Sequence, residues 1–401
     1  MISFKYFFYK IKDVKISDLF SFFKMLLAVI LVPLYKEKYS GAWLVCEEPY
    51  EARDNGYIFF KYLRKIKEKE NCYYAIKRSS VDYEKVAILG PTIEYGSIQH
   101  WLAYFLCSYN ISSQKGGKPN AAICSFFELL KIFKTKNIFL QHGIIINNLE
   151  WLYADNSKID LFITSTMPEY KYVCDVFGYD TSVIQLTGLP RFDELHNLNV
   201  VENQILIMPT WRYWFNLKSK SIKGEDSNFE TSEYLNKWQE LLNSEYLSEL
   251  INRYNLKVIF YPHRNMQNHL RDFNITNKNI IIADWRNYDI QKLLKESRLM
   301  ITDYSSVFFD MIYMKKNVIF YQFDIDKYRK IQYKEGYFDY SNNPFANSYV
   351  DSNGVLKRLD ELIQNEYKLN ETYQIAFHEY FKYHDVNNCK RVYDRIESMN
   401  L

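Results

Sequence analysis

The feature that most constrains the fold is a succession of short apolar runs, rich in β-branched and aromatic residues, that alternate with helix-length segments. A first series lies at residues 42–49, 74–78, 86–91, 137–143, 160–166 and 182–190. A second series lies at residues 204–211, 257–263, 280–285, 299–306 and 317–324. Near-continuous apolar runs of this length are typical of parallel strands that are buried on both faces. Two such series predict an α/β protein with two doubly wound domains.

Length and composition agree with two folded domains. A chain of 401 residues is too long for one comfortable core, and 48% hydrophobic with 25% charged residues is typical of a globular protein. We place the domain limits at 41–195 and 196–401, after a distinct segment at 1–40, and the last helix of the second domain can pack back on the first. The net charge of +3 gives no reason to expect a nucleic-acid partner, and we predict none.

The cysteines and glycines exclude several classes of site. The six cysteines show neither C-x-x-C nor a Cys/His metal spacing, which favours a reducing compartment. There is no G-x-x-x-x-G-K-[ST] loop and no G-x-G-x-x-G, which argues against a P-loop NTPase or a dinucleotide enzyme. The acidic pair in Asp324–Asp326 is too common a pattern to indicate a metal. We therefore predict no metal site and no cofactor.

The segment 1–40 has its own composition. An apolar run from Leu19 to Tyr35 is interrupted by Lys24 and Pro33, and it is shorter than the roughly 20 residues of a spanning helix. Lys36–Lys38 follows where a secretory signal would have a small-residue cleavage site, so we do not expect a signal peptide. Lysines flank the run on both sides, which favours a helix that lies in a membrane surface. The alternative is a core helix of the first domain.

Polar residues collect where the predicted strands end. Ligands of open α/β sheets bind outside the carboxyl ends of the strands. The clusters at these ends are Glu48, His142-Gly143, Thr187-Gly188, Thr210-Trp211-Arg212, His263-Arg264 and Asp303–Ser306. We interpret them as facing one cleft between two domains, an arrangement typical of a nucleotide-dependent transferase.

The segment Asp303-Tyr304-Ser305-Ser306 has two interpretations. Asp303 or Ser305 can cap the following helix, which is the common role of such residues. The same hydroxyls and backbone N–H groups can instead hold a phosphate. Taken alone the segment favours a cap, and beside the other strand-end clusters it favours phosphate binding.

Basic residues at the strand ends suggest individual roles. His142 can take a proton from an attacking hydroxyl, with a hydrogen bond to a neighbouring loop as the alternative. His263 and Arg264 suit a pyrophosphate, with a solvated loop pair as the alternative. Arg212 brings another guanidinium to the same edge, and Arg191 stands where the two domains meet.

Six segments appear together in one order. They are "EEPYEARDNGYIFFKYL" at 47–63, "FLQHGIIINNLEWL" at 139–152, "TGLPRFD" at 187–193, "MPTWR" at 208–212, "YPHRN" at 261–265 and "ITDYSSVFFDMIYMKKNVIFYQFDIDKY" at 301–328. In this order they resemble the CDP-glycerol:glycerophosphotransferase family, the teichoic-acid and capsule polyol-phosphate transferases. The resemblance covers residues 45–340.

The resemblance implies a GT-B-like fold and an enzyme of cell-surface polymer synthesis. A CDP-polyol donor would bind mainly to 196–401, and 41–195 would face a lipid-linked acceptor. A polyol phosphate, first of all glycerol phosphate, would pass to an acceptor hydroxyl while CMP leaves. Such an enzyme would work as a peripheral protein at the cytoplasmic face of the plasma membrane.

The resemblance also implies roles for residues. The catalytic residues would be His142, as general base, and His263. The donor phosphate and nucleotide would be bound by Arg212, Arg264, Asp303, Ser305 and Ser306. The acceptor side or the domain boundary would be formed by Glu48, Gly143 and Arg191.

Two other functions stay open at this point. One is a GT-B glycosyltransferase that uses a nucleotide sugar, with the same fold and a different donor. The other is a non-catalytic scaffold at the membrane surface. The sequence also does not decide whether the polyol is glycerol or ribitol, which acceptor is used, or whether one unit is added or a polymer is made. The oligomeric state and a requirement for an ion that bridges the phosphates stay open as well.

Overall fold

The computed structural model describes residues 15–66, 71–130, 133, 135–215 and 228–399. Residues 1–14 of the predicted membrane segment therefore lie outside the described residues. The chain divides into two compact units: unit 1 comprises residues up to 144, 149–194 and 383 onward, and unit 2 comprises 145–148 and 195–382. The chain returns to unit 1 at residue 383, so the C-terminal helix belongs to the first unit, the option that the sequence left open. The short segment 145–148, which a single cut at residue 195 would place in unit 1, belongs to unit 2.

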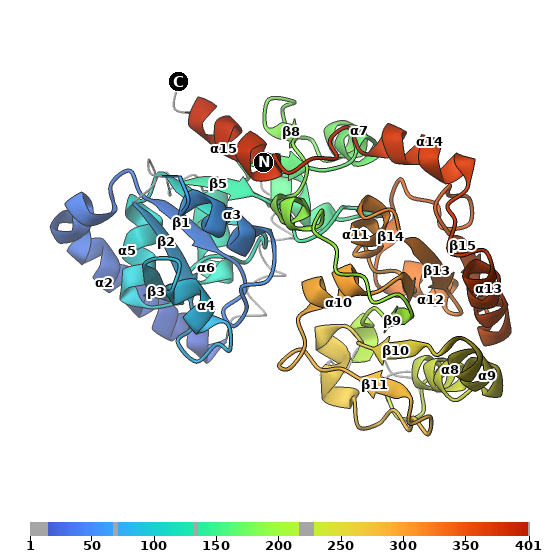
Figure 1. Ribbon diagram of the computed structural model, residues 1–401. Helices are drawn as coiled ribbons and strands as arrows, with labels where there is room; N and C mark the ends of the chain where they lie inside the picture. The colour runs from blue at the N-terminus through green and yellow to red at the C-terminus, as the bar shows by residue number, and fades with distance from the viewer. Residues whose placement is uncertain (1–14, 67–70, 131–132, 134, 216–227, 400–401) are drawn as a thin grey trace. The chain divides into compact units, whose positions relative to one another are not determined.

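The described part of unit 1 contains a seven-stranded parallel sheet in the order β3-β2-β1-β4-β5-β7-β8 (Figure 1). Its strands are β1 (Trp43–Cys46), β2 (Cys72–Ile76), β3 (Thr92–Glu94), β4 (Tyr109–Ser112), β5 (Lys136–Phe139), β7 (Leu161–Thr164) and β8 (Ile184–Leu186). The helices around it are α2 (Ile16–Tyr39), α3 (Asn55–Leu63), α4 (Tyr83–Ala87), α5 (Ile98–Leu106), α6 (Ala121–Leu129), α7 (Met167–Val176) and α15 (Asn388–Ser398).

Strand β1 shows why this sheet is covered on both faces. Trp43 and Val45 pack into one buried cluster with residues of α3 and α15. Leu44 and Cys46 pack into a second cluster with residues of α2 and α5. Successive side chains of a strand point to opposite faces, so an all-apolar strand needs helices on both sides.

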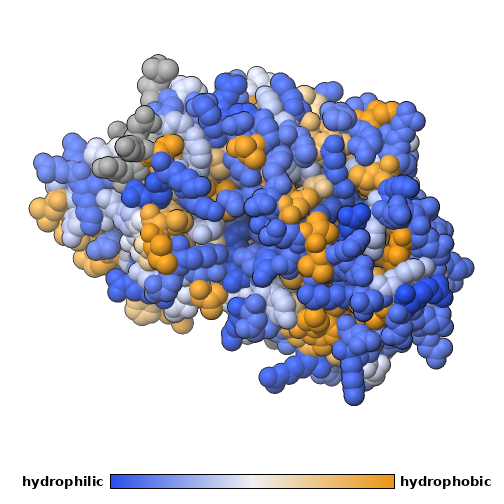
Figure 2. All heavy atoms as spheres, in the orientation of Figure 1, coloured by the Kyte–Doolittle hydropathy of each residue, from blue (hydrophilic) through white to orange (hydrophobic). Residues whose placement is uncertain are grey.

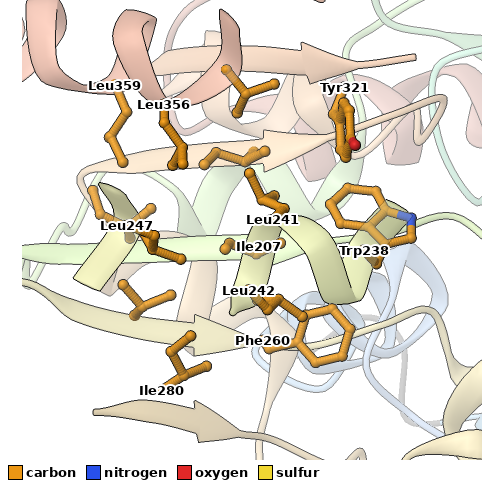
Figure 3. Close-up of a cluster of buried hydrophobic side chains, with 14 of the residues drawn as sticks. Ile207, Trp238, Leu241, Leu242, Leu247, Phe260, Ile280, Tyr321, Leu356 and Leu359 are labelled. Atoms are coloured by element: carbon orange, nitrogen blue, oxygen red, sulfur yellow. The ribbon is translucent and has the colours of Figure 1, made fainter. Parts of the chain in front are cut away.

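The described part of unit 2 repeats the plan with six parallel strands in the order β11-β10-β9-β12-β13-β15. They are β9 (Gln204–Met208), β10 (Lys257–Phe260), β11 (Ile280–Ile282), β12 (Leu299–Thr302), β13 (Asn317–Tyr321) and β15 (Asn347–Tyr349). The helices are α8 (Glu233–Leu242), α9 (Glu245–Tyr254), α10 (Ile290–Glu296), α11 (Phe308–Tyr313), α12 (Ile325–Ile331), α13 (Ser352–Gln364) and α14 (Glu371–Tyr380). Figure 3 shows strand residues such as Ile207 and Phe260 packed with Trp238 of α8 and Leu356 of α13.

The predicted fold class is confirmed, with two corrections to the strands. Residues 86–91 do not form a strand: Val86 lies in α4, and Ile88 is 83% exposed, which a strand buried on both faces would not allow. Val86 and Leu89 reach the core at a helical spacing of three residues. The strands β3, β4 and β15 were not predicted, because "TIE", "YNIS" and "NSY" contain too many polar residues to form an apolar run.

Within the described part of the N-terminal segment, residues 16–39 form one continuous helix. α2 runs for 24 residues through Pro33, which the sequence suggested as an interruption. One face packs Met25 and Ala28 against residues of α5. The opposite face exposes Ile16, Leu19, Phe20, Phe23, Leu27, Ile30 and Leu34. Hydrophobic side chains are visible on the surface over α2 in Figure 2. Within the described part of the chain, α2 alone is long and apolar enough to cross a membrane.

A buried ion triad holds the loops of unit 2 together. Arg212 is fully buried, and its guanidinium lies 2.8 Å from Asp303 Oδ2 and 2.8 Å from Asp324 Oδ2. Asp303 Oδ1 also accepts hydrogen bonds from the backbone N–H groups of Thr210 and Tyr304. Burial opposes the charge of Arg212, but the two carboxylates outweigh it and hold the pKa of the guanidinium above its usual value. The segments that follow β9, β12 and β13 are therefore fixed to one charge.

We expect Asp324→Asn to destabilise unit 2 by about 3–5 kcal/mol, because removing one partner leaves a buried guanidinium undercompensated. The measurement is urea unfolding followed by tryptophan fluorescence. Asp326→Asn is the matched control, since Asp326 lies in the first turn of α12, two residues after Asp324, and is exposed. A control of this kind should stay within about 0.5 kcal/mol of the parent. Equal midpoints for the two variants would show that the triad does not stabilise the unit.

Candidate active site

His142 lies at the carboxyl end of β5, two residues after the buried Leu140. The residue before it, Gln141, has a φ of 65°, a left-handed conformation that costs a non-glycine residue energy. Three hydrogen bonds hold Gln141 in place: its side-chain amide donates to Ile163 O and Glu169 Oε1, and its carbonyl accepts from Asn55 Nδ2. The backbone turn that places His142 at this edge is thus held by hydrogen bonds to buried residues.

His142 has a carboxylate partner. Its Nδ1 lies 2.6 Å from Oδ2 of Asp54, and 62% of the His142 side chain is exposed against 16% of the Asp54 side chain. Arg191 lies 2.9 Å from the other oxygen of Asp54 and also donates to the carbonyl of His142 at 2.6 Å. The backbone N–H of Arg191 donates to Asn55 Oδ1, which closes a ring of contacts back to Gln141.

The electrostatics of this group favour an ionised carboxylate. Burial raises the pKa of Asp54, but His142 and Arg191 outweigh it, and the net pKa lies below its ordinary value. Desolvation lowers the pKa of His142, but the charge and hydrogen bond of Asp54 outweigh it, and the net pKa lies above its ordinary value. An ionised carboxylate can only accept, so Nδ1 of His142 carries a proton and Nε2 is the basic nitrogen.

A second buried carboxyl group beside His142 and Asp54 is that of Glu47. It is 3% exposed, whereas the predicted Glu48 is exposed to solvent. Glu47 accepts hydrogen bonds from the backbone N–H groups of Arg53, Asp54 and Tyr57. Burial, and then the charge of Asp54, raise the pKa of Glu47 to about 7. A Cβ at Gly56 would lie 2.8 Å from Glu47 Cγ, so the first turn of α3 needs glycine there.

In unit 2, His263 lies three residues after the end of β10 and is partly exposed. Its Nδ1 accepts a hydrogen bond from Asn265 N at 3.2 Å, so the neutral ring carries its proton on Nε2 and can donate from there. Its ring lies beside Trp211, with centroids 6.3 Å apart. The guanidinium of Arg264 lies 4.2 Å from the ring centroid of Trp285. This is a cation with an aromatic support at the carboxyl edge of the sheet.

The segment Asp303–Ser306 divides into two parts. Asp303 has no exposed surface and serves the triad with Arg212. Any effect of these two residues on a ligand would act through the loops that they fix. Ser305 is 8% exposed and its Oγ accepts from Val307 N, while Ser306 is partly exposed. The two hydroxyls are the part of this segment that lies nearest to solvent.

The structure therefore brings the predicted residues together within each unit. His142, Gly143 and Arg191 form one group in unit 1. In unit 2 Arg212 contacts Asp303, and His263, Arg264, Ser305 and Ser306 lie in the segments that follow β10 and β12 of the same sheet. No group of His, Cys, Asp and Glu that could hold a metal ion occurs among the described residues. The acid Asp324 of the "DID" triplet is occupied by Arg212.

Sequence reasoning missed Asp54, Asn55, Gln141 and Glu47. An aspartate just before an apolar helical run is a signal for a helix cap, so Asp54 could have been noted as structural. Its contact with His142 joins residues 88 positions apart, and no local pattern predicts it.

Comparisons with known proteins agree with this architecture. The model of the CDP-Glycerol:Poly(glycerophosphate) glycerophosphotransferase family matches residues 30–398. The minor teichoic acid biosynthesis protein GgaB of Bacillus subtilis is 32% identical over 366 residues, which are 88% of this chain and 39% of GgaB. The teichoic acid glycerol-phosphate transferase of Staphylococcus aureus is 24% identical over 255 residues, 56% of this chain and 60% of the relative. The chain thus spans two fifths to three fifths of the length of these curated relatives.

Solved structures show the same fold. The wall teichoic acid polymerase TagF aligns with a TM-score of 0.66 and 19% identity, over 96% of this chain and 99% of the TagF chain. A putative UDP-N-acetylglucosamine 2-epimerase from Listeria monocytogenes aligns with a TM-score of 0.57 and 13% identity, over 90% of this chain and 97% of the epimerase. The match over nearly the whole chain shows that this protein belongs to the CDP-glycerol:poly(glycerophosphate) glycerophosphotransferase family.

Proposed function

We propose that the protein transfers glycerol phosphate from CDP-glycerol to a hydroxyl group of a teichoic-acid acceptor and releases CMP. The observation that carries this proposal is the family match over residues 30–398, which includes both units and both strand-end groups. The names of the relatives point the same way, because they are teichoic acid transferases and polymerases. TagF, which shares the fold, has been solved after soaking with CDPG.

In this proposal unit 1 supplies the base. The hydroxyl oxygen of the acceptor attacks the β-phosphorus of the donor, its proton passes to Nε2 of His142, and CMP leaves with the bonding electron pair. Phosphoryl transfer asks for little covalent chemistry from the protein, so positioning and charge stabilisation dominate. Gly143 and Arg191 belong to the same group, and we place them on the acceptor side. We also place Glu48, which is exposed, on the acceptor side.

Unit 2 would bind the donor. Arg264 and the Nε2–H of His263 would contact the phosphate oxygens, together with the hydroxyls of Ser305 and Ser306. Arg212 and Asp303 would affect donor binding indirectly, because both are fully buried and hold the loops after β9 and β12.

We further propose that α2 lies in the membrane surface at the cytoplasmic face, where CDP-glycerol and a lipid-linked acceptor would meet. One face of α2 packs on the protein through Met25 and Ala28, and the apolar face opposite is exposed. Lys15, Lys24 and Lys36 lie within or beside the helix and would add attraction to anionic lipid. A helix that keeps its contact with α5 cannot be surrounded by lipid, which favours an in-plane position over a spanning one.

Purified protein should release CMP from CDP-glycerol in the presence of a lipid-linked acceptor, and His142→Ala should lower the rate by about 10²–10⁴-fold. Donor binding should stay within a few-fold, because His142 is not a proposed donor contact. His378→Ala, a change at an exposed histidine of α14, is the control.

A donor screen accompanies this assay. CDP-ribitol, UDP-sugars and GDP-sugars are offered under the same conditions. Release of UDP or GDP with no CMP would replace the proposal with a glycosyltransferase, and no turnover of any donor would favour a scaffold. Wild-type turnover by His142→Ala would remove His142 from the mechanism.

For the donor side, Arg264→Ala and the double change Ser305→Ala/Ser306→Ala should each weaken CDP-glycerol binding. A charge-assisted phosphate contact contributes about 1.5–3 kcal/mol, which calorimetry resolves. Arg286→Ala is a matched control, because Arg286 lies 5.7 Å from the same Trp285 ring and is exposed. Unchanged affinity in both test variants would return the segment Asp303–Ser306 to a purely structural role.

The position of α2 is tested by flotation with phosphatidylglycerol vesicles. Phe20→Ser/Phe23→Ser/Ile30→Ser should reduce vesicle binding by at least about 10²-fold, because burial of each such side chain contributes about 1.5–3 kcal/mol. Ile375→Ser/Val386→Ser is the control, since these residues are 55% and 58% exposed outside α2. Equal flotation of test and control would exclude a membrane role for this face. Retention in membranes at alkaline carbonate would instead indicate a spanning helix.

A further inference from the structure

We propose that Asp54 is a positioning residue for the transfer reaction: it fixes the tautomer and the orientation of His142, and Arg191 in turn fixes Asp54. This inference rests on the proposed function, in which His142 is the general base. It concerns a carboxylate whose position in the sequence suggests only a helix cap.

The first argument is the distribution of contacts on the Asp54 carboxylate. Oδ2 lies 2.6 Å from Nδ1 of His142, and Oδ1 lies 2.9 Å from the guanidinium of Arg191. Each oxygen thus faces a hydrogen-bond donor whose charge or partial charge is positive. With Nδ1 protonated and held, the ring can accept a proton only at Nε2, which points the base away from the carboxylate.

The second argument is that Asp54 is an unusual cap. A capping side chain normally accepts from the second or third N–H group of the helix. Asp54 accepts from Asn55 N at 2.8 Å, which is the first residue of α3. The carboxylate is therefore placed for His142 and Arg191 at the expense of ordinary capping geometry.

The third argument is that the backbone of Asp54 is held independently of its side chain. Glu47 accepts from the N–H groups of Arg53, Asp54 and Tyr57, and Ser113 Oγ donates to the same carboxylate. Arg191 also donates to the carbonyl of His142, so the carboxylate of Asp54 and the backbone of His142 are fixed to one guanidinium. Rigid placement of this kind reduces the reorganisation needed when the imidazole becomes charged.

The test compares two substitutions that separate capping from positioning. Asp54→Asn keeps size and capping ability, but its amide nitrogen can donate to Nδ1 and so favours the wrong tautomer. Asp54→Ser is a good cap without a carboxylate. We expect both to lower kcat by about 10²–10⁴-fold with KM for CDP-glycerol within about threefold. Rescue of kcat by Asp54→Ser would reduce Asp54 to a cap and overturn the inference.

The pH profile gives a second readout. The charged groups that face His142 are Asp54 and Glu47, which raise its pKa, and Arg191, which lowers it. His142 must lose its proton to act as a base, so the acid limb of kcat should lie above the ordinary histidine pKa and shift to lower pH when the carboxylate is removed. Asp82→Asn is the matched control: Asp82 accepts from Ala52 N and Arg53 Nε beside the same loop, and its loss should leave the limb in place.

A third readout needs no turnover. Long-range ¹H–¹⁵N spectra of the seven histidines, with His142 assigned by its absence in His142→Ala, report the tautomer directly. We expect the Nδ1–H form in the parent protein and its loss in Asp54→Asn. An Nε2–H tautomer in the parent would overturn the inference. Absence of CMP release by the parent would sink the proposed function, and the spectra would still decide whether Asp54 sets the state of His142.

Discussion

A buried guanidinium held by carboxylates fixes the carboxyl edge of the sheet in each unit. In unit 1 Arg191 joins Asp54 to the carbonyl of His142, and in unit 2 Arg212 joins Asp303 to Asp324. Parallel strands place their polar connections at one edge, where the backbone has no sheet partners of its own. A planar donor with five N–H groups can satisfy several loops at once, and a lysine cannot do the same with one flexible ammonium.

The immediate neighbours of the two histidines give their rings different hydrogen-bonding states. His142 donates through Nδ1 to a carboxylate, which leaves Nε2 as a base. His263 accepts through Nδ1 from a backbone N–H, which leaves Nε2–H as a donor. The same side chain at the same kind of strand end thus acquires opposite chemistry from its neighbour. These two contacts leave a basic nitrogen on His142 and an N–H donor on His263.

The sequence predicted much of the fold because burial on both faces requires apolar residues at every position of a strand. β9 is such a case, with four consecutive buried apolar residues from Ile205 to Met208. β4 was missed because Asn110, a polar residue, is buried in the strand and donates to Gly117 O. The hydrophobic pattern of the sequence does not predict such a contact. Residues 86–91 were misread as a strand because a short apolar run does not distinguish a period of two from one of three.

For the site, the sequence by itself determined which chemical groups lie at the ends of strands: His142, His263, Arg264 and the serines of Asp303–Ser306. It did so because parallel strands bring their carboxyl ends to one edge. Only the tertiary structure decided which of two adjacent glutamates is buried, that Arg212 serves carboxylates within the core, and that Asp54 contacts His142. These outcomes depend on contacts between residues far apart in the chain, which no local sequence pattern predicts. Neighbouring side chains can point in opposite directions, so a shift of one residue exchanges a buried position for an exposed one.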